Sequence, residues 1–173
     1  MLTEIDLPAL EFICLNLRAV DAREIYNVVD HDNPMLLAHQ AHYMAVTKGR
    51  GVIAWWKGKP AACIAFTEER PTVWLISMFG TDDFRNVAID CMRWARRTAV
   101  EMIAERKGRR LQCDSHIEHE EAHKFLTVLG ARREGPPMKH YGKDGSDYIR
   151  FVWIAEDNGI ISLGALGHGL SAA

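Results

Sequence analysis

The pattern with the most specific chemistry lies in the C-terminal half of the chain. Residues His119-Glu120-Glu121-Ala122-His123 match H-E-x-x-H, in which two imidazoles one helical turn apart bind zinc and the glutamate acts as general base. The helix carrying it has an apolar stripe formed by Ala122, Phe125, Leu126 and Leu129. This spacing leaves His119 at the edge of the buried side and His123 outside it.

A peptidase needs a third zinc ligand, and no further histidine follows at a suitable spacing in the same helix. We therefore interpret His119 and His123, with nearby His116, as a solvated face. Two alternatives stay open: adventitious metal binding by these three histidines, and, more remotely, a zinc metallopeptidase that uses His119-Glu120-x-x-His123.

Other reactive side chains carry weaker signals. The four cysteines are isolated and predict reduced, buried thiols: Cys14, Cys63, Cys91 and Cys113. Neither Ser77 nor Cys113 has the sequence context of a nucleophile. A basic set predicts mainly a solvated helix side: Arg93, Arg96, Arg97, Arg106, Lys107, Arg109 and Arg110. The five tryptophans fall mostly in predicted strands, which indicates core packing.

Composition limits the class of protein. The chain has 173 residues, 48% of them hydrophobic and 25% charged, with a formal net charge of −2. These values predict one globular domain and argue against binding to nucleic-acid phosphates. The apolar runs are too short for a membrane span, and Glu4 and Asp6 stand where a secretion signal carries basic residues. We expect a cytoplasmic protein.

The elements that must position these side chains alternate along the chain. Predicted strands cover residues 12–17, 51–56, 61–66, 72–79, 111–114, 132–141 and 148–154, with a turn at 143–146. Predicted helices cover residues 21–29, 34–49, 83–107 and 118–129, with Asp21 as N-cap of the first. A Gly-rich apolar segment, residues 158–173, follows a single domain over residues 1–157, and it is either a flexible terminus or a docking tail that orders on a partner.

This element order resembles the GNAT fold of N-acetyltransferases, and two motifs support the resemblance. The segment His119–Ala131 keeps the eight-residue separation between Ala122 and Gly130 that many GNAT proteins show. With the Asp-Gly turn and the final strand YIRFVWI, it also looks like GNAT-like internal virion proteins of short-tailed phages. The implied fold class is α/β (α+β): a mixed, mostly antiparallel, twisted sheet of about seven strands flanked by about four helices.

The resemblance also implies where acetyl-CoA would bind. The family-equivalent positions are Met78, Phe79, Gly80, Thr81 and Arg85 after the fourth strand, and His119 on the later helix. GNAT enzymes bind the CoA pyrophosphate there through a Gly-rich turn and a helix N-terminus. Here one glycine remains, and Asp82 and Asp83 would repel the pyrophosphate. Leu126 stands where a tyrosine often protonates the leaving thiolate.

We therefore expect a degenerate acyl-CoA site, no required cofactor, and function through contacts with other phage or virion proteins by way of residues 158–173. The expected location is the host cytoplasm and the virion, without a membrane. The alternative is an active N-acetyltransferase that uses acetyl-CoA on an amine acceptor, with no catalytic residue that the sequence can assign.

Overall fold

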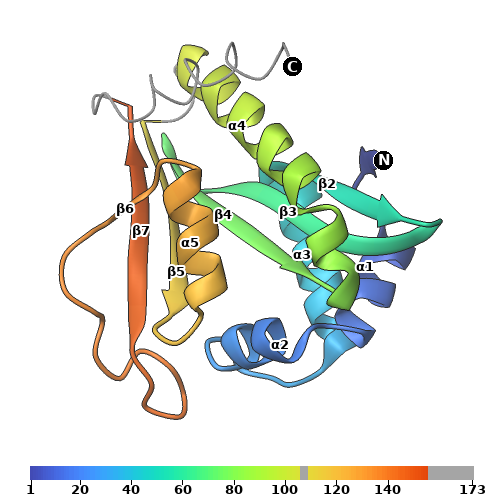
Figure 1. Ribbon diagram of the computed structural model, residues 1–173, viewed down its shortest axis with the longest axis horizontal. Coiled ribbons are helices and arrows are strands. Elements are labelled where there is room, and N and C mark those ends of the chain that lie inside the picture. The colour runs from blue at the N-terminus through green and yellow to red at the C-terminus, as the bar shows by residue number, and fades with distance from the viewer. Residues whose placement is uncertain (106–108, 156–173) are drawn as a thin grey trace, which may run out of the picture.

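A computed structural model describes residues 1–105 and 109–155, which form one seven-stranded sheet with helices on both faces (Figure 1). The strands are β1 (Leu2–Glu4), β2 (Gly49–Trp56), β3 (Lys59–Arg70), β4 (Val73–Gly80), β5 (Arg110–His116), β6 (Arg132–Arg133) and β7 (Tyr148–Ile154). The helices are α1 (Leu7–Leu15), α2 (Ala19–Tyr26), α3 (Pro34–Lys48), the 3₁₀ helix η1 (Asp82–Asn86), α4 (Ala88–Ala104) and α5 (Glu120–Val128).

Strands β4 and β5 are neighbours in the sheet but pair over only part of their length, which leaves an opening between them. The strand order is β1-β2-β3-β4-β5-β7-β6, and only the β4–β5 pair is parallel. That pair covers Val73–Leu75 and Arg110–Gln112, after which β4 and β5 diverge (Figure 1). Helix α2 lies below the opening in this view. Beyond that pair, residues 76–80 of β4 and 113–116 of β5 do not pair with each other.

Two hydrophobic cores cover the two faces of the sheet. Helices α4 and α5 pack on one face, with Phe66, Leu111 and Phe151 at the centre of that core. Helices α1 and α3 pack on the other, against Ile53, Cys63 and Phe79. The alternation of strand residues between the two cores is the period-2 pattern of a sheet covered on both sides.

The predicted fold class is confirmed, and several predicted elements are found nearly as expected. Helix α3 begins at Pro34, with Asn33 as N-cap, and the β2–β3 hairpin turns at Lys57-Gly58. Within the described residues, no helix combines the length and hydropathy needed to cross a bilayer.

The predicted strand over residues 12–17 is wrong, because residues 12–15 form the end of helix α1 and Asn16 is its C-cap. The Asp6 side chain accepts a hydrogen bond from the Ala9 backbone N–H, and Pro8 lies in the first turn, so both start signals favour a helix. The sequence LPALEFICL is apolar almost throughout. A short apolar run of this kind does not distinguish a buried helix from a strand.

Other boundaries also differ. The helix predicted over residues 83–107 is split into η1 and α4, with Thr81 as N-cap of η1. Asp21 is not an N-cap but lies inside α2. The strand predicted over residues 132–141 has only two residues, because Pro136 and Pro137 cannot donate ladder hydrogen bonds. Strand β1 was not predicted.

Candidate functional site

The turn after β4 is held by the segment that leads into α2 and by α2 itself. The backbone N–H of Gly80 donates to Asp21 Oδ2 at 2.8 Å, and the Gly80 carbonyl accepts from the Arg18 N–H at 2.9 Å. The next amide, of Thr81, donates to the Ala61 carbonyl at 2.8 Å. Both hydrogen-bonding groups of the Gly80 backbone are therefore used inside the protein.

Two amides at the start of η1 are also engaged. The Asp83 N–H donates to Thr81 Oγ1 at 3.2 Å, and the Phe84 N–H donates to the Thr81 carbonyl at 2.9 Å. Together with Gly80 and Thr81, four backbone N–H groups of this turn have internal acceptors. An anion that binds here would have to displace them.

Gly80 is required by packing. A Cβ at this position would lie 2.6 Å from the Ala61 carbonyl oxygen and 3.2 Å from Phe84 Cβ. The space that a glycine leaves open in a phosphate-binding turn is thus filled by the protein's own atoms.

A buried ion pair attaches α2 to this turn. Arg18 donates from Nε and Nη2 to the two carboxylate oxygens of Asp21, at 3.0 and 2.7 Å, and Asp21 is only 3% exposed. The Arg18 guanidinium also lies 4.4 Å from the centroid of the Phe84 ring. The bidentate pair and the Gly80 N–H satisfy the buried carboxylate.

The other end of α2 is attached to the β5 side of the opening. The Glu24 carboxylate contacts His119 Nδ1. The backbone carbonyl of Glu24 accepts a hydrogen bond from the Tyr148 hydroxyl at 2.8 Å. Arg23 pairs with Glu118 at 2.6 Å. Helix α2 therefore bridges the diverging ends of β4 and β5.

The structure separates the predicted site residues into two groups. Met78, Phe79, Gly80, Thr81 and Arg85 follow one another along β4 and η1; Phe79 is buried in the core with α1 and α3, and Arg85 is exposed. His119 lies across the opening, against Glu24. The sequence analysis missed the roles of Arg18, Asp21 and Glu24. The only local signal was the opposite charge of Arg18 and Asp21 three residues apart.

The prediction of a solvated histidine face is wrong. His123 is buried, its Nε2 bonds the His116 carbonyl at 3.0 Å, and its ring packs on Phe151. Burial lowers the pKa of His123 below 6.5. His116 is also buried, and its Nδ1 accepts from the Glu118 N–H.

The H-E-x-x-H pattern does not form a zinc site in this fold. Helix α5 begins at Glu120, so His119 precedes the helix and contacts Glu24, whereas His123 points into the core. Among residues 1–105 and 109–155, no cluster of three His, Cys, Asp or Glu side chains is arranged to bind a metal ion.

The remaining candidates are structural. All four cysteines are free and buried as predicted, and burial raises the pKa of each, to about 12 for Cys14 and Cys91. Arg93 and Arg97 are exposed on α4 as expected. Arg110 instead forms an ion pair with Glu134, and residues 106 and 107 of the basic set lie outside the described residues.

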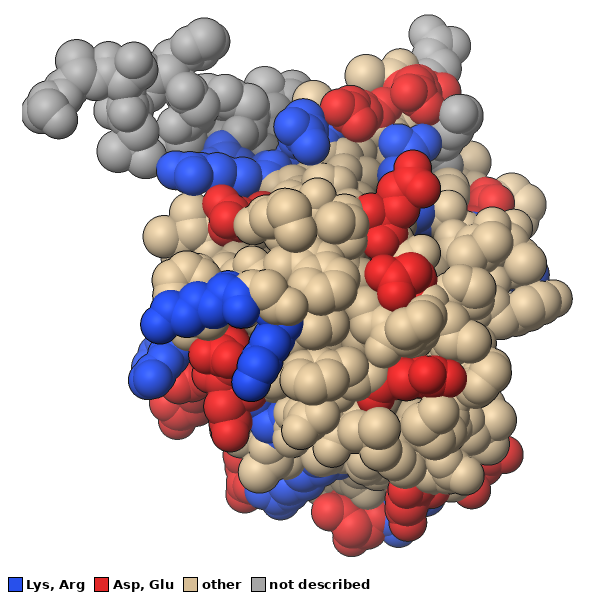
Figure 2. Space-filling model, turned by 90° about the vertical axis from the view of Figure 1, so that its right-hand side faces the viewer, with Lys and Arg blue, Asp and Glu red and all other residues tan. Residues whose placement is uncertain are grey.

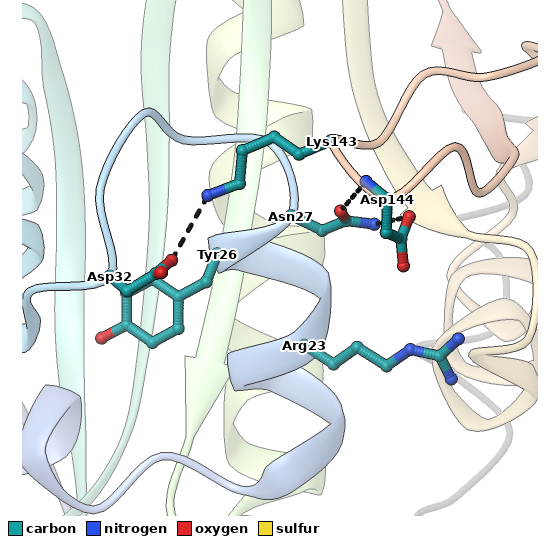
Figure 3. Close-up of a pocket in the computed structure, with 6 residues that line it drawn as sticks. All are labelled: Arg23, Tyr26, Asn27, Asp32, Lys143 and Asp144. Carbon is teal, nitrogen blue, oxygen red and sulfur yellow. Dashed lines mark hydrogen bonds and ion pairs between the residues drawn. The ribbon is translucent and has the colours of Figure 1, made fainter.

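A shallow hollow of about 410 Å³ lies between the C-terminal end of α2 and the β6–β7 loop (Figure 3). Its lining is Arg23, Tyr26, Asn27, Asp32, Lys143 and Asp144. These side chains are largely engaged with each other or with their surroundings. Lys143 pairs with Asp32, and hydrogen bonds from Ser146 and Asn27 lower the pKa of Asp144 to about 2. The hollow thus offers mixed charge and no activated nucleophile or base.

Solved structures place the fold among acetyltransferases. An N-acetyltransferase from Staphylococcus aureus Mu50 superposes with a TM-score of 0.70 at 15% identity, covering 90% of this chain and 98% of that one. A GNAT-family acetyltransferase from Bacillus anthracis gives 0.66 at 16%, covering 90% and 95%. RimL, a ribosomal L7/L12 α-N-protein acetyltransferase solved with coenzyme A, gives 0.67 at 13%, covering 88% and 92%.

The chain therefore has the GNAT fold, and identities this low establish the fold alone. No protein-family profile matches the chain, and no curated protein matches it significantly in sequence.

At the turn where the family resemblance places the CoA pyrophosphate, several backbone donors are already bonded within the protein. The amides of Gly80, Thr81, Asp83 and Phe84 already have acceptors, and Asp21 is a carboxylate at the point where a phosphate would need a donor. The carboxylates of Asp82 and Asp83 add negative charge at the start of η1.

Proposed function

We propose that this protein has kept the GNAT fold without the acetyl-CoA site and that it works through contacts with other proteins. One observation carries the proposal: Arg18 and Asp21 occupy both backbone hydrogen-bonding groups of Gly80. In this arrangement the protein's own chain satisfies the strand edge that would otherwise bind the arm of a cofactor.

The later helix supports the same proposal. Leu126, which stands where a tyrosine often acts as acid in the family, is buried in the core beside α4 and cannot donate a proton. His119, the other family-equivalent position, contacts Glu24.

The more specific form of the proposal is a phage protein associated with the virion. It is supported by the resemblance of the segment His119–Ala131 and the strand YIRFVWI to internal virion proteins of short-tailed phages. Residues 158–173, the proposed docking tail, lie outside the described residues. Deleting them should abolish assembly into particles while circular dichroism of the domain stays unchanged. Normal incorporation of the shortened chain would refute the role of the tail.

Calorimetric titration of the full chain with acetyl-CoA tests the proposal. We expect no saturable heat at millimolar acetyl-CoA. Micromolar one-to-one binding would overturn the proposal. If binding were found, Arg85→Ala should weaken it, since Arg85 is the exposed cation next to the turn. Arg93→Ala, in exposed α4, is the matched control.

The alternative is an active N-acetyltransferase that uses acetyl-CoA on an amine acceptor. The divergence of β4 and β5 favours it, because this opening is retained in the fold. Under this alternative Arg18 and Asp21 must leave Gly80 before the donor binds. Steady formation of free thiol from acetyl-CoA in the presence of polyamines or peptide amines would support it.

A further inference from the structure

Helix α2 is attached to the rest of the protein mainly by polar contacts. Among its eight residues, all of them described, Asp21 alone is buried, and Val20 is exposed. Ile25 and Tyr26 pack only partly against the core of α1 and α3. Most helices of globular proteins are held by an apolar side that packs in the core. A helix without such a side has low local stability, because water can replace its polar contacts.

The polar contacts of α2 reach three other segments. Asp21 accepts a hydrogen bond from the Gly80 N–H in the turn after β4, and the Glu24 carboxylate contacts His119 just before α5. The C-cap residue Asn27 bonds the loop between β6 and β7. In Figure 2, the lower end of the molecule, at the level of α2 in Figure 1, carries acidic and basic side chains next to each other. Charged and polar groups thus hold α2 in place.

The observed position of α2 leaves a buried polar group unsatisfied. The hydroxyl group of Tyr26 is buried and has no hydrogen-bond partner among the described residues. A polar group that loses water without gaining a partner destabilises the state that buries it. Movement of α2 away from the core would return this hydroxyl to water. The unsatisfied group therefore favours a second position of the helix.

Arg18, which precedes α2, is anchored independently of the helix. Its backbone N–H donates to the Gly80 carbonyl at 2.9 Å, and its guanidinium lies 4.4 Å from the centroid of the Phe84 ring. Neither contact involves a residue of α2. Arg18 can therefore stay on the turn while residues 19–26 move, which makes it the hinge position.

We infer that α2 is a strap that closes over the turn at Gly80 and opens about Arg18 while the sheet stays folded. Opening frees the Gly80 N–H and the Arg18 guanidinium. The carboxylate of Asp21 accepts from both, which shows the chemistry that these donors fit. The open strap thus admits a carboxylate of another molecule in place of Asp21. That this carboxylate is an acidic side chain of a partner protein rests on the proposed function, whereas the opening of the strap does not.

Hydrogen exchange of two adjacent amides, followed by NMR in the full chain, tests the opening. The Gly80 N–H donates to Asp21 on α2, whereas the Thr81 N–H donates to the Ala61 carbonyl on β3. If the strap opens alone, Gly80 should exchange roughly 100-fold faster than Thr81 after correction for intrinsic rates. Equal protection of the two amides would overturn the inference, because α2 would then open only together with the sheet.

A change at the other end of α2 shows whether the helix moves as a unit. Glu24→Ala removes the contact with His119 and introduces a good helix former. It should speed the exchange of Gly80 roughly tenfold and leave Thr81 unchanged. The matched control is Glu11→Ala, which removes the glutamate–histidine contact between α1 and α3 and should change neither amide. An unchanged Gly80 rate in Glu24→Ala, or equal acceleration of both amides, would contradict a strap that opens as a unit.

The ligand class is tested by NMR with Asp21→Ala, in which the internal carboxylate is absent. The probe is a tripeptide with blocked ends and a Glu side chain as its single carboxylate, and the same peptide with Gln is the control. We expect only the Glu peptide to shift the Gly80 amide signal saturably. No shift, or a shift with acetate but not with the peptide, would overturn the assignment to a partner protein.

The exchange measurements do not use Asp21→Ala, so they test the strap even if this variant fails to fold. Acetyl-CoA titration of the wild-type chain reports on the proposed function separately. Micromolar binding would overturn that proposal and leave the exchange result as it stands.

Discussion

The carboxylate of Asp21 accepts a hydrogen bond from the backbone N–H of Gly80, 59 residues away in the chain. This contact, with the Arg18–Asp21 ion pair and the Glu24–His119 contact, holds α2 across the divergence of β4 and β5. A helix thus occupies backbone groups that the GNAT resemblance would give to a cofactor. The contacts that hold α2 across the open sheet are thus also the contacts that engage the Gly80 backbone.

Asp21→Ala should lower the free energy of unfolding by roughly 3 kcal/mol, because it leaves the Arg18 guanidinium and the Gly80 N–H without their buried acceptor. Urea unfolding followed by tryptophan fluorescence measures the loss. Asp30→Ala, in an exposed position after α2, should change it by less than about 0.5 kcal/mol. Equal losses of unfolding free energy in the two variants would show that the Asp21 contact does not stabilise the fold.

Gly80→Ala should destabilise the fold by about 3 kcal/mol, because the new Cβ would lie 2.6 Å from the Ala61 carbonyl oxygen. The control is Gly58→Ala in the β2–β3 turn, where no atom is within 4 Å and the cost, about 1 kcal/mol, comes from a φ of +77°. Thermal unfolding compares the two variants. A Gly80→Ala chain as stable as wild type would mean that this turn has free space.

The stability of the protein should fall as the pH drops below 6.5 because of His123. Burial lowers the pKa of His123 in the folded state, so below pH 6.5 the unfolded chain binds more protons at this site. The loss approaches about 1.4 kcal/mol per pH unit until the lowered folded pKa is reached. His123→Gln, which keeps a donor for the His116 carbonyl, should reduce the change in urea midpoint between pH 7.5 and pH 5.5. An identical change in both proteins would contradict this assignment.

The four thiols should be inert in the folded protein. All are buried, and burial raises the pKa of each, so the reactive thiolate is scarce near neutral pH. An aromatic disulfide reagent at pH 7.5 should titrate almost no thiol in minutes, and all four in urea. Rapid reaction of one thiol in the native protein would identify an accessible cysteine that this structure does not contain.

Much of the fold follows from local sequence patterns. The apolar runs at residues 61–66, 72–79 and 148–154 predict strands, the second of them covered on both faces, and Asn33-Pro34 predicts the start of α3. The strand prediction failed at α1, whose uniformly apolar sequence carries no period. The histidine prediction failed because the buried side of α5 is wider than its apolar stripe. This side includes His123, whose ring packs on Phe151 of β7.

The candidate site depends on contacts that no local pattern contains. The sequence singled out the turn at Gly80, and the structure places Asp82 and Asp83 in the first turn of η1. It could not show that Asp21 binds Gly80, or that Glu24 meets His119 95 residues away, since tertiary structure alone brings these residues together. The contacts that engage the turn at Gly80 therefore depend on the tertiary structure and not on any local sequence pattern.

Amide chemical shifts measured by NMR during titration with acetyl-CoA test the central claim most directly. With the amides of Gly80, Thr81, Asp83 and Phe84 bonded within the protein, their signals should stay unchanged up to millimolar acetyl-CoA. Saturable shifts of these four signals at micromolar acetyl-CoA would contradict the account. They would show that the cofactor displaces α2 from the turn at Gly80.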